Sequence, residues 1–181
     1  AKIVHDTQPD CLVSGRIMNN QGDFLTLPDN HTPRNPIDQA WETPCTFCNT
    51  WGYKSWIERP PQDKQLRKQL QSLSKVVSMG GNYLLNIGPL PDGSILDYEK
   101  EVLEKISDWM SINGEGIHGT STNPLQHIPW GNITIKDEEI YLHVKEWPED
   151  GVLNVPGLST AVTAKLLSTN QPIPSSQSDG G

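Results

Sequence analysis

Aromatic and ionisable side chains gather in the first third of the sequence, in segments with little periodic structure. The aromatic members are Trp41, Trp51, Tyr53 and Trp56, and the ionisable members are Asp23, Asp29, His31 and Glu42. Sugars pack their CH-rich faces on aromatic rings, while their hydroxyls bond to acids and amides. The combination favours a carbohydrate site, with a plain packing role for the tryptophans as the alternative.

Three cysteines, Cys11, Cys45 and Cys48, offer a different chemistry. Cys45 and Cys48 form a lone C-x-x-C pair. A zinc site would need a second pair, or histidines at ligand spacing, and neither follows. An odd number of cysteines also gives no complete disulfide framework. We therefore expect ordinary thiols and no metal site, with a metal or redox role of the pair as the alternative.

Composition excludes two classes of partner. The 181 residues are 34% hydrophobic and 20% charged, with a net charge of -8. Nucleic acids and anionic membrane surfaces both require a basic footprint, which this balance does not supply. No apolar run approaches the ~20 residues that span a bilayer. The first residues lack the pattern of a signal peptide, so they leave the compartment unknown.

Helix and strand patterns alternate as far as about residue 120. Residues 62–79 have apolar positions at helical spacing, and the pattern stops at Gly80-Gly81. Residues 83–87 form an apolar run typical of a buried strand, and residues 97–112 are helical again. Residues 11–14 are a short strand candidate. Residues 15–63, which follow this strand candidate, are predicted to be long loops broken by short elements.

This order of strand, loop and helix is typical of an α/β barrel or a doubly wound sheet. An α/β barrel carries its active site on the loops that follow its strands. Three such loops are predicted, at 16–38, at 41–53 and at 88–92. We therefore expect the aromatic and acidic residues of the first two loops to line a site.

Beyond about Thr122 the pattern changes to short β-rich segments separated by turns. Strands are predicted at 133–135, 140–144, 152–155 and 162–166. Such spacing indicates an antiparallel sheet. The polar tail at 171–181 is predicted to contain no closing strand.

Several sequence blocks resemble the α-L-fucosidases of glycoside hydrolase family 29. They are W-E-T at 41–43, T-W-G-Y at 50–53, V-S-M-G-G-N-Y-L-L-N-I-G-P at 77–89, D-G at 92–93 and I-N-G-E-G-I-H-G-T at 112–120. The segments L-H-V at 142–144, W-P at 147–148 and V-P-G-L at 155–158 are similar to the start of the family's C-terminal β-sandwich. The resemblance implies an α/β fold: the C-terminal half of a (β/α)8-type barrel over 1–120, then part of an antiparallel β-sandwich over 121–181.

The resemblance also implies a retaining double-displacement mechanism that releases terminal α-L-fucose from glycans without a cofactor. In that mechanism one carboxylate attacks the anomeric carbon, and a second acid protonates the leaving oxygen and later activates water. In the family the nucleophile lies upstream of the segment that aligns with Ala1. The nucleophile is therefore expected to be absent from this chain, which looks truncated at both ends.

The acid/base residue is less directly indicated. Many relatives place a Glu shortly after a G-D-[YF]-x-T stretch, which here is Gly22–Thr26, yet no Glu occurs between Gly22 and Trp41. Asp29 is the first candidate for the acid/base and Asp23 the second, with turn formation as the alternative role for both. His31 stands where some relatives carry the Glu, and it could shuttle a proton.

Four residues are candidates for substrate binding. Trp51 matches an aromatic that, in the family, packs on the apolar side of fucose near its methyl group. Trp41, His31 and Glu42 are the others, and Glu42 has an alternative role in holding its loop by hydrogen bonds. The amides of Asn82 and Asn86 are expected to tie loops to the backbone.

Two functional classes remain open on the sequence. The first is a glycoside hydrolase acting on a fucosylated glycan. The second is a catalytically incomplete fragment, or a non-catalytic sugar-binding or assembly subunit, which lacks the nucleophile. An open half-barrel would expose strand edges and an apolar face, so an oligomer or a completing chain is an expected partner. Family resemblance implies a secreted, periplasmic or lysosomal location.

Overall fold

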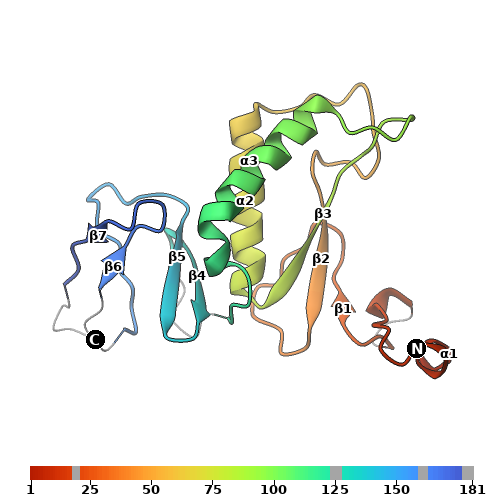
Figure 1. Ribbon diagram of the computed structural model, residues 1–181, viewed down its shortest axis with the longest axis horizontal. Coiled ribbons are helices and arrows are strands. Elements are labelled where there is room, and N and C mark those ends of the chain that lie inside the picture. Colours follow the sequence, from red (N-terminus) through yellow and green to blue (C-terminus); the bar gives the residue numbers. More distant parts are fainter. Residues whose placement is uncertain (18–20, 123–127, 159–162, 177–181) are drawn as a thin grey trace.

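A computed structural model describes residues 1–17, 21–122, 128–158 and 163–176 (Figure 1). A small parallel sheet lies on one side of a pair of helices, and two small antiparallel sheets lie on the other side. A short N-terminal helix, α1 (Lys2–Thr7), stands beyond the parallel sheet. Within the described ranges, no helix combines the length and apolarity needed to cross a membrane.

The parallel sheet contains β1 (Leu25–Thr26), β2 (Trp41–Thr46) and β3 (Gly81–Asn86), in that order. A single parallel bridge between Ser14 and Phe24 continues the sheet beyond β1. The carboxyl ends of all these segments therefore meet at one edge of the sheet.

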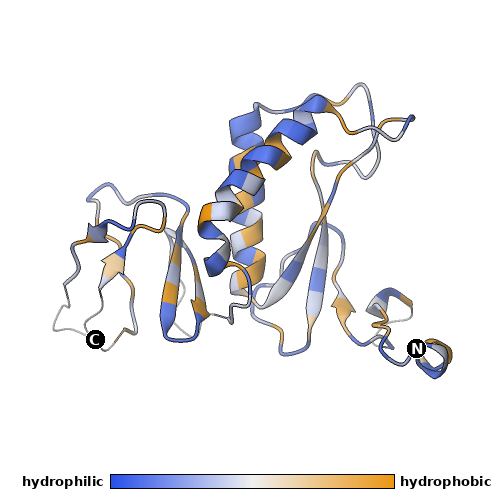
Figure 2. Ribbon diagram, in the orientation of Figure 1, coloured by the Kyte–Doolittle hydropathy of each residue, from blue (hydrophilic) through white to orange (hydrophobic). Residues whose placement is uncertain are grey.

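Two helices of 17 residues each, α2 (Gln62–Ser78) and α3 (Asp97–Asn113), pack together beside the sheet. Both agree with the helical spacing in the sequence. Each helix alternates hydrophobic and hydrophilic residues along its length (Figure 2), as expected for a helix with one buried face. Val76 of α2 is 1% exposed and Val102 of α3 is fully buried. After α2, Gly80 takes a φ of +79°, a value that glycine adopts without strain.

The two faces of the parallel sheet have different surroundings. On the face covered by α2, Trp41 is fully buried, and a Cβ on Gly81 would lie 2.3 Å from its ring. Tyr83 on the same face donates its hydroxyl to Gln69 of α2. On the opposite face, Leu84 is 50% exposed. Because successive side chains of a strand point to opposite faces, each strand places some side chains under α2 and others on the open face of the sheet.

The antiparallel part begins with β4 (Gly131–Lys136) and β5 (Glu139–Val144), whose turn has Asp137 at a φ of +53°. Their apolar core consists of Ile128, Trp130 and Ile133, with partly buried neighbours from both strands and the following loop. The second antiparallel pair joins β6 (Ala164–Lys165) to β7 (Pro172–Ile173).

A direct hydrogen bond joins the two parts of the molecule. Asn132 of β4 donates its side-chain amide to the Ser74 hydroxyl of α2 over 3.0 Å. A 3-10 turn at Gly114–Gly116 follows α3 and also contacts β4. The antiparallel pair is therefore packed on the ends of the two helices.

Some sequence predictions were wrong. Residues 15–63 were predicted to be long loops broken by short elements, with Trp41 and Glu42 in a loop. These two residues instead belong to β2, the centre of the sheet, because its side chains pack on both faces. Residues 11–14 form one bridge in place of a strand. Residues 152–155 are irregular, and the tail contributes β7. The strand predicted at 162–166 appears as β6, with Val162 outside the described residues.

Candidate functional site

The loops that leave the carboxyl edge of the parallel sheet are tied to one another. Asn86, the last residue of β3, donates its side-chain amide to the carbonyl oxygen of Trp51 over 2.8 Å. This confirms the role expected for that amide. Trp51 lies on the loop after β2, and its side chain remains 43% exposed. The loop is thus fixed through its backbone while its tryptophan faces solvent.

A close backbone contact reinforces this connection. A Cβ on Gly88 would lie 2.8 Å from both the Gly52 carbonyl carbon and the Tyr53 amide nitrogen. Only a residue without a side chain fits there. The loop after β3 therefore lies directly against the loop that carries Trp51.

A buried carboxylate lies behind the same loops. Glu99, in the first turn of α3, is 4% exposed, and it accepts a hydrogen bond from the Gly88 N–H. Burial raises the pKa of Glu99, and the positive charge of Arg59 partly offsets that rise. Arg59 also lies over the Tyr53 ring, with its guanidinium carbon 5.9 Å from the ring centroid. Glu99 thus contacts the loop after β3, and Arg59 contacts the ring of Tyr53 in the loop after β2.

Asp29 lies on the loop that follows β1, at the carboxyl edge of the sheet. Its carboxylate forms an ion pair with Arg16, and both side chains are about half exposed. Arg16 donates a second hydrogen bond, to the Leu27 carbonyl oxygen over 3.2 Å. The next residue, Asn30, accepts hydrogen bonds from the Thr46 amide and hydroxyl over 2.8 and 3.1 Å. The loop is therefore attached to the end of β2.

Glu42 lies on the open face of the sheet. One of its carboxylate oxygens accepts a hydrogen bond from the Thr26 hydroxyl over 2.8 Å, and that hydroxyl lies 2.6 Å from the hydroxyl of Ser14. The three side chains form a polar network across neighbouring segments of the sheet, which we call the open-face network. Glu42 is the second residue of β2 and does not lie in a loop, so its contacts hold neighbouring strands together.

Asp23 lies at the opposite edge of the sheet, two residues before β1. Its carboxylate accepts a hydrogen bond from the Val13 amide over 2.7 Å and lies 2.9 Å from the His5 ring nitrogen. These hydrogen bonds lower the pKa of Asp23, with the Val13 amide as the main cause. The structure therefore separates the two aspartate candidates and gives Asp23 an anchoring position.

The remaining two candidates, Trp41 and His31, lie in different environments, the first buried and the second exposed. Trp41 was predicted to bind substrate, but it is fully buried in β2 on the covered face, where Gly81 leaves room for its ring. In this fold Trp41 is a core residue. His31 is exposed, and its carbonyl oxygen accepts the hydroxyl hydrogen of Thr43, a buried residue of β2.

The C-x-x-C pair is divided between the sheet and the core. Cys45 lies in β2, and Cys48 is 6% exposed beside Phe47 and Val102. Burial raises the pKa of both thiols, which makes them poor nucleophiles and poor metal ligands at neutral pH. Among the described residues, no three His, Cys, Asp or Glu side chains gather in a metal-binding group.

Sequence reasoning missed two residues that shape the loops, Glu99 and Arg16. Glu99 has the signature of an ordinary acidic residue in a helix's first turn, which is favoured there by the helix dipole. Its burial depends on Gly88 and Arg59, which are distant in sequence. For Arg16, the sequence indicated only that it follows the first strand candidate, and nothing in the sequence paired it with Asp29.

A family model described as α-L-fucosidase matches residues 1–115. Human tissue α-L-fucosidase is 33% identical over 155 residues, which cover 81% of this chain and 32% of that protein. The α-L-fucosidase of Dictyostelium discoideum is 31% identical over 135 residues, which cover 73% and 29%. The chain thus spans about a third of the length of these curated relatives.

Solved structures agree with this assignment. α-L-fucosidase isoenzyme 1 from Paenibacillus thiaminolyticus has a TM-score of 0.85 at 27% identity, covering 96% of this chain and 44% of that one. The α-L-fucosidase of Vibrio sp. strain EJY3 has a TM-score of 0.74 at 30% identity, covering 82% and 26%. A Bacteroides thetaiotaomicron enzyme, solved as a trapped covalent intermediate with 2-fluoro-fucosyl fluoride, shares the fold with a TM-score of 0.85 at 23% identity, covering 99% and 46%. With a family match over most of its length and these relatives, the chain belongs to the α-L-fucosidases of glycoside hydrolase family 29.

Proposed function

We propose that this chain supplies part of the active site of a retaining α-L-fucosidase, which releases terminal α-L-fucose from glycans. The observation that carries the proposal is the exposed Trp51, fixed at the carboxyl edge of a parallel sheet by Asn86 and Gly88. That edge is where α/β barrels place their active sites. A half-exposed indole on a fixed backbone suits stacking against the apolar side of a sugar.

The division into a half-barrel over 1–120 and part of a β-sandwich over 121–181 is the architecture that we propose for the chain. Parallel strands with helices on one face support the first part. The antiparallel pairs β4–β5 and β6–β7 support the second. The uncovered face of the parallel sheet would then face the interior of the completed barrel.

Within the site, we assign Asp29 as the acid/base and place the nucleophile in a part of the protein outside this chain. Retaining glycosidases keep the two carboxyl groups about 5–5.5 Å apart. Asp29 is at the carboxyl edge, whereas Asp23 is at the other edge with its carboxylate bonded to Val13. Arg16 would hold the Asp29 carboxylate in place. A trapped covalent intermediate in the Bacteroides enzyme, obtained with a glutamate-to-glutamine mutant, is consistent with the retaining mechanism.

The test uses the full-length protein with para-nitrophenyl α-L-fucoside as substrate. Asp29→Asn is expected to lower kcat by about 10²–10⁴-fold, the usual contribution of a general acid/base. Added azide should restore turnover, because it attacks the covalent intermediate without needing a base. Asp23→Asn serves as the matched control and should keep its turnover while losing thermal stability. An Asp29→Asn enzyme with unchanged kcat would remove Asp29 from the mechanism.

A further inference from the structure

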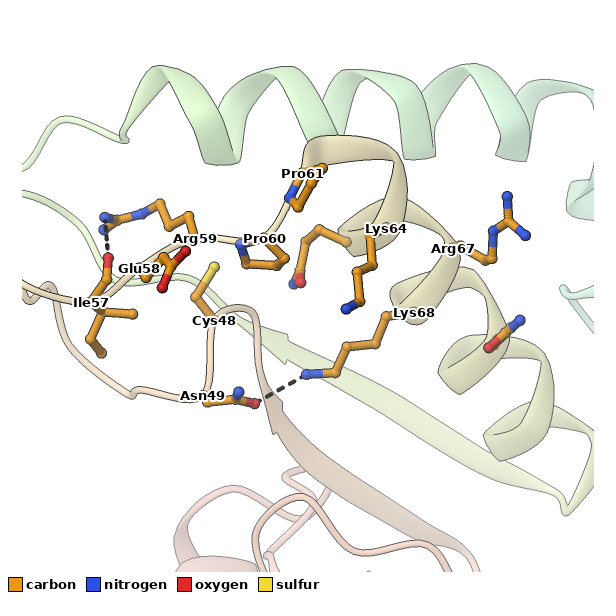
Figure 3. A pocket seen from close by; sticks show the side chains of 12 residues that line it. Cys48, Asn49, Ile57, Glu58, Arg59, Pro60, Pro61, Lys64, Arg67 and Lys68 are labelled. Carbon is orange, nitrogen blue, oxygen red and sulfur yellow. Dashed lines mark hydrogen bonds between the residues drawn. The ribbon is translucent and has the colours of Figure 1, made fainter.

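A pocket of about 760 Å³ lies between the loop after β2 and the first turns of α2 (Figure 3). Its lining includes four cationic side chains, Arg59, Lys64, Arg67 and Lys68, and one acidic side chain, Glu58. Lys64 and Lys68 extend from α2 toward the loop, whereas Arg67 lies farther along the helix. The pocket is strongly positive in a chain whose net charge is -8.

Lys64 and Lys68 have no acidic partner among the ion pairs of the described residues, whereas the charge of Arg59 acts on the buried carboxylate of Glu99. Lys68 donates only to the neutral amide oxygen of Asn49, over 3.1 Å. Arg59 uses one terminal nitrogen on the Ile57 carbonyl oxygen, and its buried Nε atom has no hydrogen-bond partner. A buried donor without a partner is costly, and an anion in the pocket would satisfy it.

The start of α2 adds to the positive potential. No side chain caps the helix at Pro61, and the acid of its first turn, Asp63, is paired with Lys105, so the first amide groups can interact with an anion. The helix dipole also places partial positive charge at this end. Lys64 and Lys68 are four residues apart, so they lie on the same side of the helix. Together these groups offer several donors to one oxyanion.

The position of the pocket relates it to the proposed active site. Asn49 and the stretch from Ile57 to Pro61 line the pocket, and Trp51 lies between them on the same loop. A glycan whose fucose packs on Trp51 could therefore extend across this loop to the pocket. Asn86 and Gly88 fix this loop, so the distance between Trp51 and the pocket should stay constant.

We propose that the pocket binds the oxyanion of an acidic sugar, a sulfate ester, phosphate ester or uronate, in the part of the glycan beyond the fucose. Arginine matches the planar geometry of such groups, and the lysines add point charges. This inference rests on the proposed function for the reaction, but binding of the oxyanion depends only on the pocket.

The first test measures binding to the full-length protein by calorimetry, with galactose sulfate, galactose and inorganic sulfate as separate probes. Galactose sulfate is expected to bind about tenfold more tightly than either of the others, and the preference should weaken as salt is added. The double variant Lys64→Gln, Lys68→Gln should abolish the preference. Lys75→Gln, an exposed position on the same helix outside the pocket, is the matched control and should retain it.

Two results would overturn the inference. Unchanged affinity in the double variant would remove the pocket as the site. Equal affinity for inorganic sulfate and galactose sulfate would show a free-anion site without saccharide recognition. A kinetic test then compares fucosyl-galactose with and without a sulfate ester on galactose: the double variant should raise KM for the sulfated substrate alone. Absence of all hydrolysis would refute the proposed function, while the binding test would still decide the pocket.

Discussion

Two small polar networks, each built around a threonine hydroxyl, have different surroundings in this molecule. The open-face network joins Ser14, Thr26 and Glu42 on the sheet face opposite the one that α2 covers, where all three residues are partly buried. The second network, which we call the joint network, connects Thr134 and His143 to the Gly116 carbonyl oxygen, between β4, β5 and the turn after α3. Thr134 is fully buried there.

The difference shows how the same hydroxyl chemistry serves two purposes. The Thr134 hydroxyl donates to the Gly116 carbonyl over 2.6 Å and lies 2.9 Å from the His143 ring nitrogen, in a place that water does not reach. A group removed there leaves its partners unsatisfied. In the open-face network, whose three residues are only partly buried in this chain, water can replace a lost partner. The joint network should therefore determine stability, and the open-face network should be free to meet a ligand or another part of the protein.

The largest expected effect on stability comes from Thr134→Val. The change keeps the shape of the side chain but removes the hydroxyl, so the free energy of unfolding should fall by about 1–3 kcal/mol. Urea denaturation of the variant and the parent chain measures this difference. The same substitution at Thr26, in the open-face network, is the matched control and should cost less than about 1 kcal/mol. Equal losses of unfolding free energy at both positions would contradict the proposed difference between the two networks.

The next effect depends on pH and tests the histidine of the joint network. Burial lowers the pKa of His143 below its ordinary 6.5, so the folded state favours the neutral ring. The unfolded chain then binds more protons below that pH, and stability should decrease as the pH falls from about 6.5 toward the folded-state pKa.

The measurement is the pH dependence of unfolding in the parent chain and in His143→Gln. Glutamine does not ionise in this pH range, and its amide can still donate to the Gly116 carbonyl. The difference in stability between the two proteins should change across this window and level off above it. Comparing the difference cancels the contributions of other groups, such as Glu99, whose pKa is raised. Parallel profiles would mean that His143 titrates as it does in the unfolded chain.

The smallest effect is expected at Glu42. Glu42→Gln keeps an acceptor for the Thr26 hydroxyl and removes a charge on the open face. We expect the free energy of unfolding to change by less than about 0.5 kcal/mol, because the partly exposed side chain keeps its hydrogen bond. Thermal and urea unfolding would show this directly. A large loss would indicate that the open-face network is structural, like the joint network.

Elements with a strong period were predictable from the sequence. The two helices and β3, β4 and β5 follow from apolar spacing and from the glycines that bound them. The central strand β2 was missed, because Trp-Glu-Thr-Pro-Cys-Thr has a proline in its middle and no clean alternation. Its six residues form a strand because sheet neighbours pack on both sides, which is information from outside the segment.

The candidate site was predictable only where a single loop decides the position of a residue. Trp51 is exposed at the carboxyl edge, as its place after a strand suggested. Trp41 has the same residue type and lies ten positions earlier, but it is buried because a strand's alternation turns it toward α2. Pairings such as Glu99 with Gly88 and Arg16 with Asp29 depend on chain segments meeting in space. No local pattern in the sequence encodes them.

The contact between Gly88 and the Gly52–Tyr53 backbone has a consequence for protein engineering. Because these two loops touch without a side chain between them, and Asn86 bonds to the Trp51 carbonyl, neither has a conformation independent of the other. If one of these loops were replaced by the loop of a relative to alter specificity, it would contact a neighbouring loop whose conformation fits the original sequence. Residues 47–61 and 87–96 would have to be exchanged together, as one cassette, for the graft to keep its geometry.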